Sequence, residues 1–129
     1  AVIVMPNIRF RTLAFAASLL SACLAALWLA APGVFVWMWQ LQPGAGTEVV
    51  GHRCGALFAG IAVMLYLVRG SGPGRERDAI STGFAVGCAL LAATGLQALY
   101  SGMAGPGILL AVVVELLLAA AFLSTRTRR

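Results

Sequence analysis

The chain has 129 residues, of which 61% are hydrophobic and 10% are charged, and its mean hydropathy is +0.96. So little polar surface excludes an ordinary soluble domain and predicts a membrane protein. The formal net charge of +5 does not indicate a nucleic-acid partner, because the arginines other than Arg53 lie at the ends of the hydrophobic runs. The chain has no lysine and is rich in alanine, glycine and arginine, which is typical of a GC-rich bacterial genome.

The first hydrophobic run, residues 12–31, is about 20 residues without a charge and is long enough for about 30 Å of helix. It is too long for the apolar part of a signal peptide and lacks a good cleavage site, so we predict an uncleaved transmembrane helix. Residues 1–4 precede Met5 and are interpreted as an upstream remnant. The folded unit is then a single membrane domain, residues 5–129.

A small side chain recurs at every fourth position of this first run. The stripe consists of Ala14, Ser18, Ala22, Ala26 and Ala30. Small side chains let a second helix approach closely in a membrane, so the stripe predicts a helix interface. Its partner is either another helix of the same chain, which we favour, or another subunit.

A short segment rich in tryptophan follows the first run. Pro32 and Gly33 end the run, and Trp37 and Trp39 come next beside Phe35. Tryptophan prefers the headgroup zone, so we expect these two side chains to anchor a short interfacial segment on the outer side.

Three further hydrophobic runs predict spans at residues 49–68, 79–100 and 108–123. We expect Glu48 to begin the second span, and we interpret the charged residues 75–78 as a solvated cap of the third. Small residues at a spacing of four mark helix-packing positions in two of the spans. These positions are Gly51, Gly55 and Ala59 in the second span, and Gly83 and Gly87 in the third.

Arginine placement predicts the topology. The N-terminal segment, the connection 69–78 and the C-terminal tail hold eight arginines, whereas the loops 40–48 and 101–107 hold none. Both termini should therefore face the cytoplasm. The predicted fold is all-α, a bundle of four transmembrane helices in a bacterial inner membrane.

Five polar side chains fall at similar depths of the predicted bundle. They are His52, Arg53, Gln97, Tyr100 and Glu115. Together they could line one outward-facing polar pocket, and Arg53 could reach Glu115 across a depth difference of about 6 Å. Three interpretations stay open: a structural ion pair, a substrate or proton site, or no contact, with Arg53 reaching the interface and Glu115 protonated.

Cofactor chemistry has little support in the sequence. Cys23, Cys54 and Cys88 are far apart, without the spacing of a metal or dithiol site. His52 has no second haem ligand at a suitable position, and the methionines are interpreted as apolar filler. We therefore expect no metal, haem or quinone cofactor.

The run Gly51 to Gly60 has the pattern G-[HR]-R-x-G-x-L-F-x-G and is followed by an arginine at Arg69. With the Pro-Gly and tryptophan segment after the first span and the glutamate inside the fourth, it resembles uncharacterised small bacterial membrane proteins akin to the DoxX-like group. The resemblance covers most of the chain from Phe10 to Leu123. It implies a four-helix fold.

Three functions compete at this stage. The favoured hypothesis is a non-enzymatic accessory subunit that forms a homo-oligomer or packs on a larger membrane complex in the lipid bilayer. The alternative is a proton-coupled carrier or lipophilic-ligand binder that uses Glu115. The third hypothesis is a redox enzyme, which is supported only by dispersed cysteines and one histidine. No nucleophile-base pair, paired acid and base carboxylates or nucleotide loop can be assembled, so we expect no enzymatic activity.

Overall fold

The computed structural model describes residues 9–126 and contains five α-helices in this range. They are α1 (Phe10–Ala30), α2 (Gly33–Trp39), α3 (Ala45–Val68), α4 (Arg75–Tyr100) and α5 (Ile108–Ser124). The all-α prediction is confirmed for the described part of the chain. The remnant interpretation of residues 1–4 and the arginines at 128 and 129 lie outside it.

Three helices, α1, α3 and α4, are long and apolar enough to cross a membrane. They contain 21, 24 and 26 residues, which corresponds to about 30–40 Å at 1.5 Å per residue. Helix α5 is apolar but shorter, with 17 residues. Helices α3 and α4 begin earlier than predicted, directly after Gly44 and Gly74. Their first turns hold Glu48, Glu76 and Asp78, and acidic groups favour the positive end of a helix.

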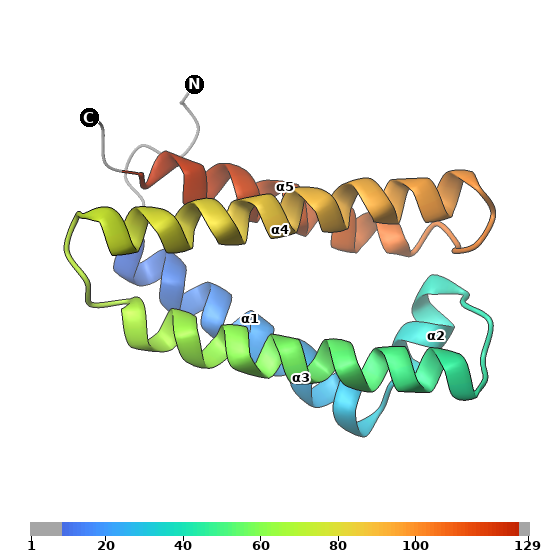
Figure 1. Cartoon of the computed structure of the whole chain (residues 1–129). Helices are drawn as coiled ribbons and strands as arrows, with labels where there is room; N and C mark the ends of the chain where they lie inside the picture. The colour runs from blue at the N-terminus through green and yellow to red at the C-terminus, as the bar shows by residue number, and fades with distance from the viewer. Residues whose placement is uncertain (1–8, 127–129) are drawn as a thin grey trace.

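The helices form two hairpins (Figure 1). Helix α1 packs mainly along α3, and α4 packs along α5, whereas α1 and α5 meet over a small area. The start of α1, the end of α5 and the connection 69–74 lie at one end of the molecule, called the inner end below. Helix α2 and the connection 101–107 lie at the other, called the outer end.

The interface between α1 and α3 depends on small side chains. A Cβ atom on Gly51 would lie 2.6 Å from a ring carbon of Trp28, and one on Gly55 would lie 3.2 Å from the carbonyl oxygen of Ala25. Further along, the buried Ser18 hydroxyl donates a hydrogen bond of 2.8 Å to the carbonyl oxygen of Ala62. The packing role predicted for the two glycines is therefore visible here, while Ala59 is half-buried.

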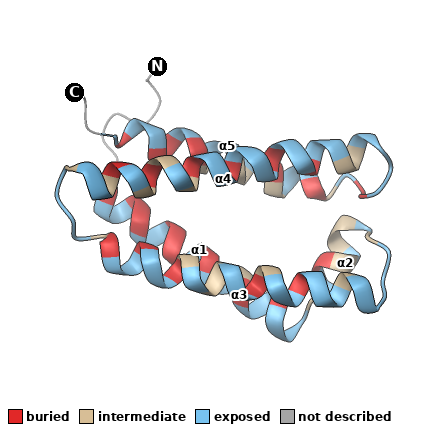
Figure 2. Cartoon of the chain, viewed as in Figure 1, coloured by how far each residue is buried: buried red, intermediate tan, exposed pale blue. Residues whose placement is uncertain are grey.

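Only the first two residues of the small-residue stripe predicted on α1 are buried. Ala14 and Ser18 are buried, but Ala22, Ala26 and Ala30 are exposed within the single chain. The buried face continues instead through small residues at alternating steps of three and four, Ser21 and Ala25. A repeat of four residues advances about 400° around the helix, so it drifts by about 40° at each step and leaves a straight interface. Figure 2 shows the buried residues of α1 along one face.

Aromatic rings close the inner end between the hairpins. The Phe122 ring contacts Phe10 at 6.2 Å and Phe84 at 4.7 Å between centroids, both with the rings steeply inclined. The Arg77 guanidinium lies over the Phe10 ring at 4.5 Å and donates a hydrogen bond of 3.2 Å to the carbonyl oxygen of Thr125. This cluster joins α1, α4 and α5.

The inner-end cluster corrects the interpretation of residues 75–78 as a solvated cap. Asp78 is 6% exposed and Arg77 is half-buried, while Arg75 and Glu76 are exposed. The segment forms the first turn of α4, and one side of that turn faces α1 and the end of α5. A pattern of charges alone does not show that a helix will bury two of them.

Helix α2 closes the outer end. The Phe35 ring stacks on Trp28 at 4.3 Å between centroids, and Trp39 contacts both rings. The Gly105 amide, in the connection to α5, donates a hydrogen bond of 2.6 Å to the carbonyl oxygen of Trp39. The exposed Trp37, with 80% of its surface accessible, matches a bilayer anchor, whereas Trp39 faces the protein. The anchor prediction is corrected for Trp39, because α2 turns that side of the helix inward.

Candidate functional site

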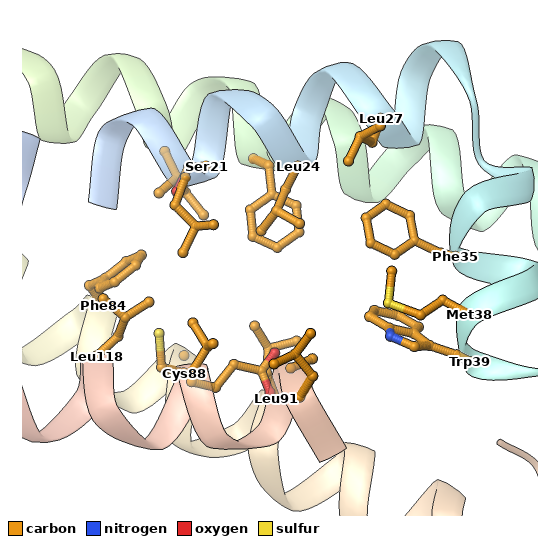
Figure 3. A pocket seen from close by; sticks show the side chains of 18 of the residues that line it. Ser21, Leu24, Leu27, Phe35, Met38, Trp39, Phe84, Cys88, Leu91 and Leu118 are labelled. Atoms are coloured by element: carbon orange, nitrogen blue, oxygen red, sulfur yellow. The ribbon is translucent and has the colours of Figure 1, made fainter. Parts of the chain in front are cut away.

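A cavity of about 430 Å³ lies between the two hairpins, and all five helices contribute to its wall. Figure 3 shows Ser21, Leu24 and Leu27 on one side and Phe84, Cys88 and Leu118 on the other. Phe35, Met38 and Trp39 of α2 close one end of the space. The aromatic cluster lies at the inner end of this space, and α2 lies at its outer end. We call this space the inter-hairpin cavity.

The inter-hairpin cavity has an almost entirely apolar wall. Its polar groups are the Ser21 hydroxyl, the Cys88 thiol, the Trp39 indole N–H and the Glu115 carboxyl. Glu115 is half-buried on α5. Within the described part of the chain, no arginine or histidine lines the cavity. The carboxyl therefore has no basic side chain beside it on this wall.

Two glycines make room for the cavity on α4. A Cβ atom on Gly83 or Gly87 would meet nothing within 4 Å, and both residues line the space. Gly95 lies more than two turns beyond Gly87 toward the outer end. It behaves differently, because its Cβ atom would lie 3.0 Å from Val112 of α5. The packing role predicted for Gly83 and Gly87 is thus corrected within the single chain: Gly95 serves the α4–α5 contact, and these two glycines widen the cavity.

Of the five polar residues predicted to form one pocket, Glu115 alone lines the inter-hairpin cavity. His52 and Arg53 are exposed on α3, and Gln97 is exposed on α4. Tyr100, with 93% of its surface accessible, is at the end of α4. These four side chains are not part of the wall of the inter-hairpin cavity.

The predicted partners Arg53 and Glu115 do not form an ion pair among residues 9–126. The prediction compared their depths, but depth is only one coordinate of a helix bundle. Helix α3 packs on α1, and α5 packs on α4, so the two residues belong to different hairpins. Of the three interpretations left open by the sequence, the geometry removes the ion pair and leaves Glu115 facing an apolar space.

The cysteines are free thiols at three different depths of burial. Cys23 is exposed, Cys54 is half-buried, and Cys88 is buried on the cavity wall. In the part of the chain that the structure describes, no three histidine, cysteine or acidic side chains gather as metal ligands would.

No protein-family model, curated protein or solved structure matches this chain. The arrangement itself must therefore indicate the chemistry. The Cys88 thiol and the Glu115 carboxyl both line the inter-hairpin cavity. An apolar cavity with one carboxyl is suited to holding a molecule that is mainly lipophilic and carries one polar or charged group.

Most of the lining residues are not predicted from the sequence. Phe35, Phe58 and Phe84 line the inter-hairpin cavity, as do Met38 and Met64, which the sequence led us to interpret as apolar filler. One signal was present in the sequence: Gly83 and Gly87 stand beside Phe84 and Cys88 on the same helix. Glycines next to large or reactive side chains can mark a cavity as readily as a helix contact.

Proposed function

We propose that this chain is a multi-pass protein of the bacterial inner membrane that binds a lipophilic small molecule in the inter-hairpin cavity. The observation that carries the proposal is the cavity itself, which holds about 430 Å³ and is apolar apart from a few groups that include Glu115. Ligand pockets commonly measure about 300–1,000 Å³ and have this kind of wall.

The inter-hairpin cavity is only partly enclosed by the chain. Lipid chains can therefore enter it in the membrane, and a ligand that binds there takes their place.

The membrane arrangement in this proposal has four spans, with both termini in the cytoplasm. Three long apolar helices and the apolar α5 support the spans. Among residues 9–126, every arginine except Arg53 lies at or near the inner end, which is the distribution of the positive-inside rule. Reporter fusions within 43–47 and at the C-terminus should give signals from opposite sides, and equal accessibility at both would refute this topology.

Photolabelling with a neutral, lipophilic aryl diazirine in lipid nanodiscs tests the binding proposal. We expect labelling of α4 and α5 at the cavity wall, and loss of that labelling in Gly87→Leu, whose new side chain would occupy the cavity. Gly60→Leu is the matched control, because Gly60 is also a helical glycine with nothing within 4 Å of an added Cβ, but it does not line the cavity. Equal labelling of the two variants would contradict the proposal.

A second candidate function is the accessory subunit, and one observation favours it. Ala22 and Ala26 are exposed on α1, away from the contact with α3, so a helix of another subunit could approach them closely. Ala26→Leu should then reduce the size of the assembly in mild detergent. If the size of the assembly does not change, the exposed alanines no longer support the accessory role. The lipophilic-ligand proposal is then the one that remains.

A further inference from the structure

We propose that the occupant of the inter-hairpin cavity is a lipophilic cation, whose charge is balanced by the Glu115 carboxylate. The inference rests on the proposed binding function and names the class of ligand. A ligand of this kind already dissolves in the bilayer. The argument therefore depends on which groups of the cavity wall can distinguish one such molecule from another.

The apolar wall cannot make that discrimination by itself. Lipid chains are as apolar as leucine side chains, so a lipophilic molecule gains no hydrophobic free energy when it moves from lipid to the inter-hairpin cavity. A cation differs, because its charge is costly in hydrocarbon and is stabilised by an opposite charge. The group that selects a ligand here is therefore Glu115.

Within residues 9–126, no basic side chain neutralises an ionised Glu115. No arginine or histidine among the described residues lines the cavity, and Arg53 does not pair with Glu115. In an apolar space the carboxyl is then either protonated and neutral or ionised beside a cation that comes from outside the chain. A ligand that this carboxyl selects by charge is therefore a cation.

Aromatic rings on the wall add to this preference. Phe35 and Trp39 close one end of the inter-hairpin cavity, and Phe58 and Phe84 also line it. The face of an aromatic ring attracts a cation, and the attraction is stronger where water is excluded. A ligand with a positive centre and an apolar body would contact both these rings and the carboxylate.

Binding in this form exchanges a proton for the cation. The O–H bond of the protonated Glu115 carboxyl breaks, its electron pair remains on the carboxylate oxygen, and the proton passes to water. The other titratable side chain on the described wall is the Cys88 thiol of α4, while α1, α2 and α3 contribute none to it. We therefore expect one proton to be released for each cation bound.

The volume of the inter-hairpin cavity also limits the size of the ligand. A space of about 430 Å³ lies near the lower end of the range for drug-sized ligands, so the site suits one compact molecule. The inference is thus a small aromatic or alkyl cation, with a single positive charge and no large polar group.

Three lipophilic probes test the charge preference in the intact chain. Tetraphenylphosphonium and the anion tetraphenylborate have nearly the same shape and opposite charge, and triphenylphosphine oxide is a smaller, neutral probe. Each is titrated into protein in nanodiscs of neutral lipid, with empty nanodiscs as the blank for partition into lipid. Bound probe is measured by equilibrium dialysis, and released protons are followed with a pH indicator in weakly buffered solution.

We expect the cation to bind at least about tenfold more tightly than either other probe, with release of one proton. Glu115→Gln should abolish that preference and the proton release. Glu48→Gln is the matched control, because Glu48 is an exposed carboxylate of α3 that does not line the cavity, and it should leave both unchanged.

Two further results separate this inference from the proposal on which it rests. If all three probes bind alike, or the cation binds without releasing a proton, and Gly87→Leu still abolishes binding, the cation inference is overturned and the lipophilic-ligand function stands. If Gly87→Leu and Gly60→Leu bind every probe as the wild type does, the cavity is not the site and both are overturned. The comparison of probes in the wild type does not depend on any variant being folded.

Discussion

Replacing Gly55 with alanine tests the close approach of α1 and α3. The added Cβ atom would lie 2.9 Å from Leu29 Cγ, 3.0 Å from Trp28 Cβ and 3.2 Å from the carbonyl oxygen of Ala25. Because the last of these atoms belongs to the backbone, α1 as a whole must shift. Overpacking of this kind costs about 1–3 kcal/mol of folding free energy.

The control for this prediction is Gly60→Ala on the same helix, where the new methyl group meets nothing within 4 Å. Both changes gain about 1 kcal/mol, because alanine is the better helix former. The difference between the two variants therefore reports the clash alone. At about 3–6 °C per kcal/mol for a chain of this length, Gly55→Ala should melt about 3–18 °C below Gly60→Ala.

Thermal unfolding in detergent, followed by circular dichroism, measures this difference. A lower melting temperature for Gly55→Ala than for Gly60→Ala is the expected result. If both variants melt at the same temperature, the two helices do not approach each other at Gly55, and the account of the α1–α3 interface is wrong.

Three other predictions follow from the packing. Ala25→Leu should lower the melting temperature and the neighbouring Ala26→Leu should not, because Ala25 is 5% exposed and Ala26 is exposed; equal losses in circular-dichroism melts would argue against this interface. Arg77→Gln should cost about 1–3 kcal/mol of folding stability in the same assay, since it removes a charged hydrogen bond and a contact with an aromatic ring. An unchanged melting temperature would indicate that Arg77 lies in solvent. Arg53→Gln and Glu115→Gln should be additive in a double-mutant cycle to within about 0.5 kcal/mol, and a larger coupling would restore the ion pair.

The hydrophobic runs predicted the helices well, because transmembrane length is a property of a single segment. The starts of α3 and α4 were less predictable. Charged residues such as Glu48 and Arg75 suggested loop or cap positions, but a helix end in an aqueous or interfacial layer can include charged residues at little cost. The breakers that matter are the glycines that directly precede each helix, Gly44 and Gly74.

Which helices are neighbours is not encoded in any one segment. The predicted contact between Arg53 and Glu115 compared depth along the two spans and assumed that their helices lie side by side. The structure pairs α3 with α1 and α5 with α4 instead. The same limit explains Ala22 and Ala26, since a spacing of four shows small residues near one side but does not fix which face meets a neighbour.

The contacts at the two ends of the molecule bear on how a ligand enters. Aromatic rings meet at the inner end, and the hydrogen bond from Gly105 to Trp39 ties α2 across the outer end. We therefore expect entry sideways, between the hairpins and from within the bilayer. The concentration that governs occupancy is then the amount of ligand per lipid, so a molecule that is scarce in water can still saturate the site once the membrane has accumulated it.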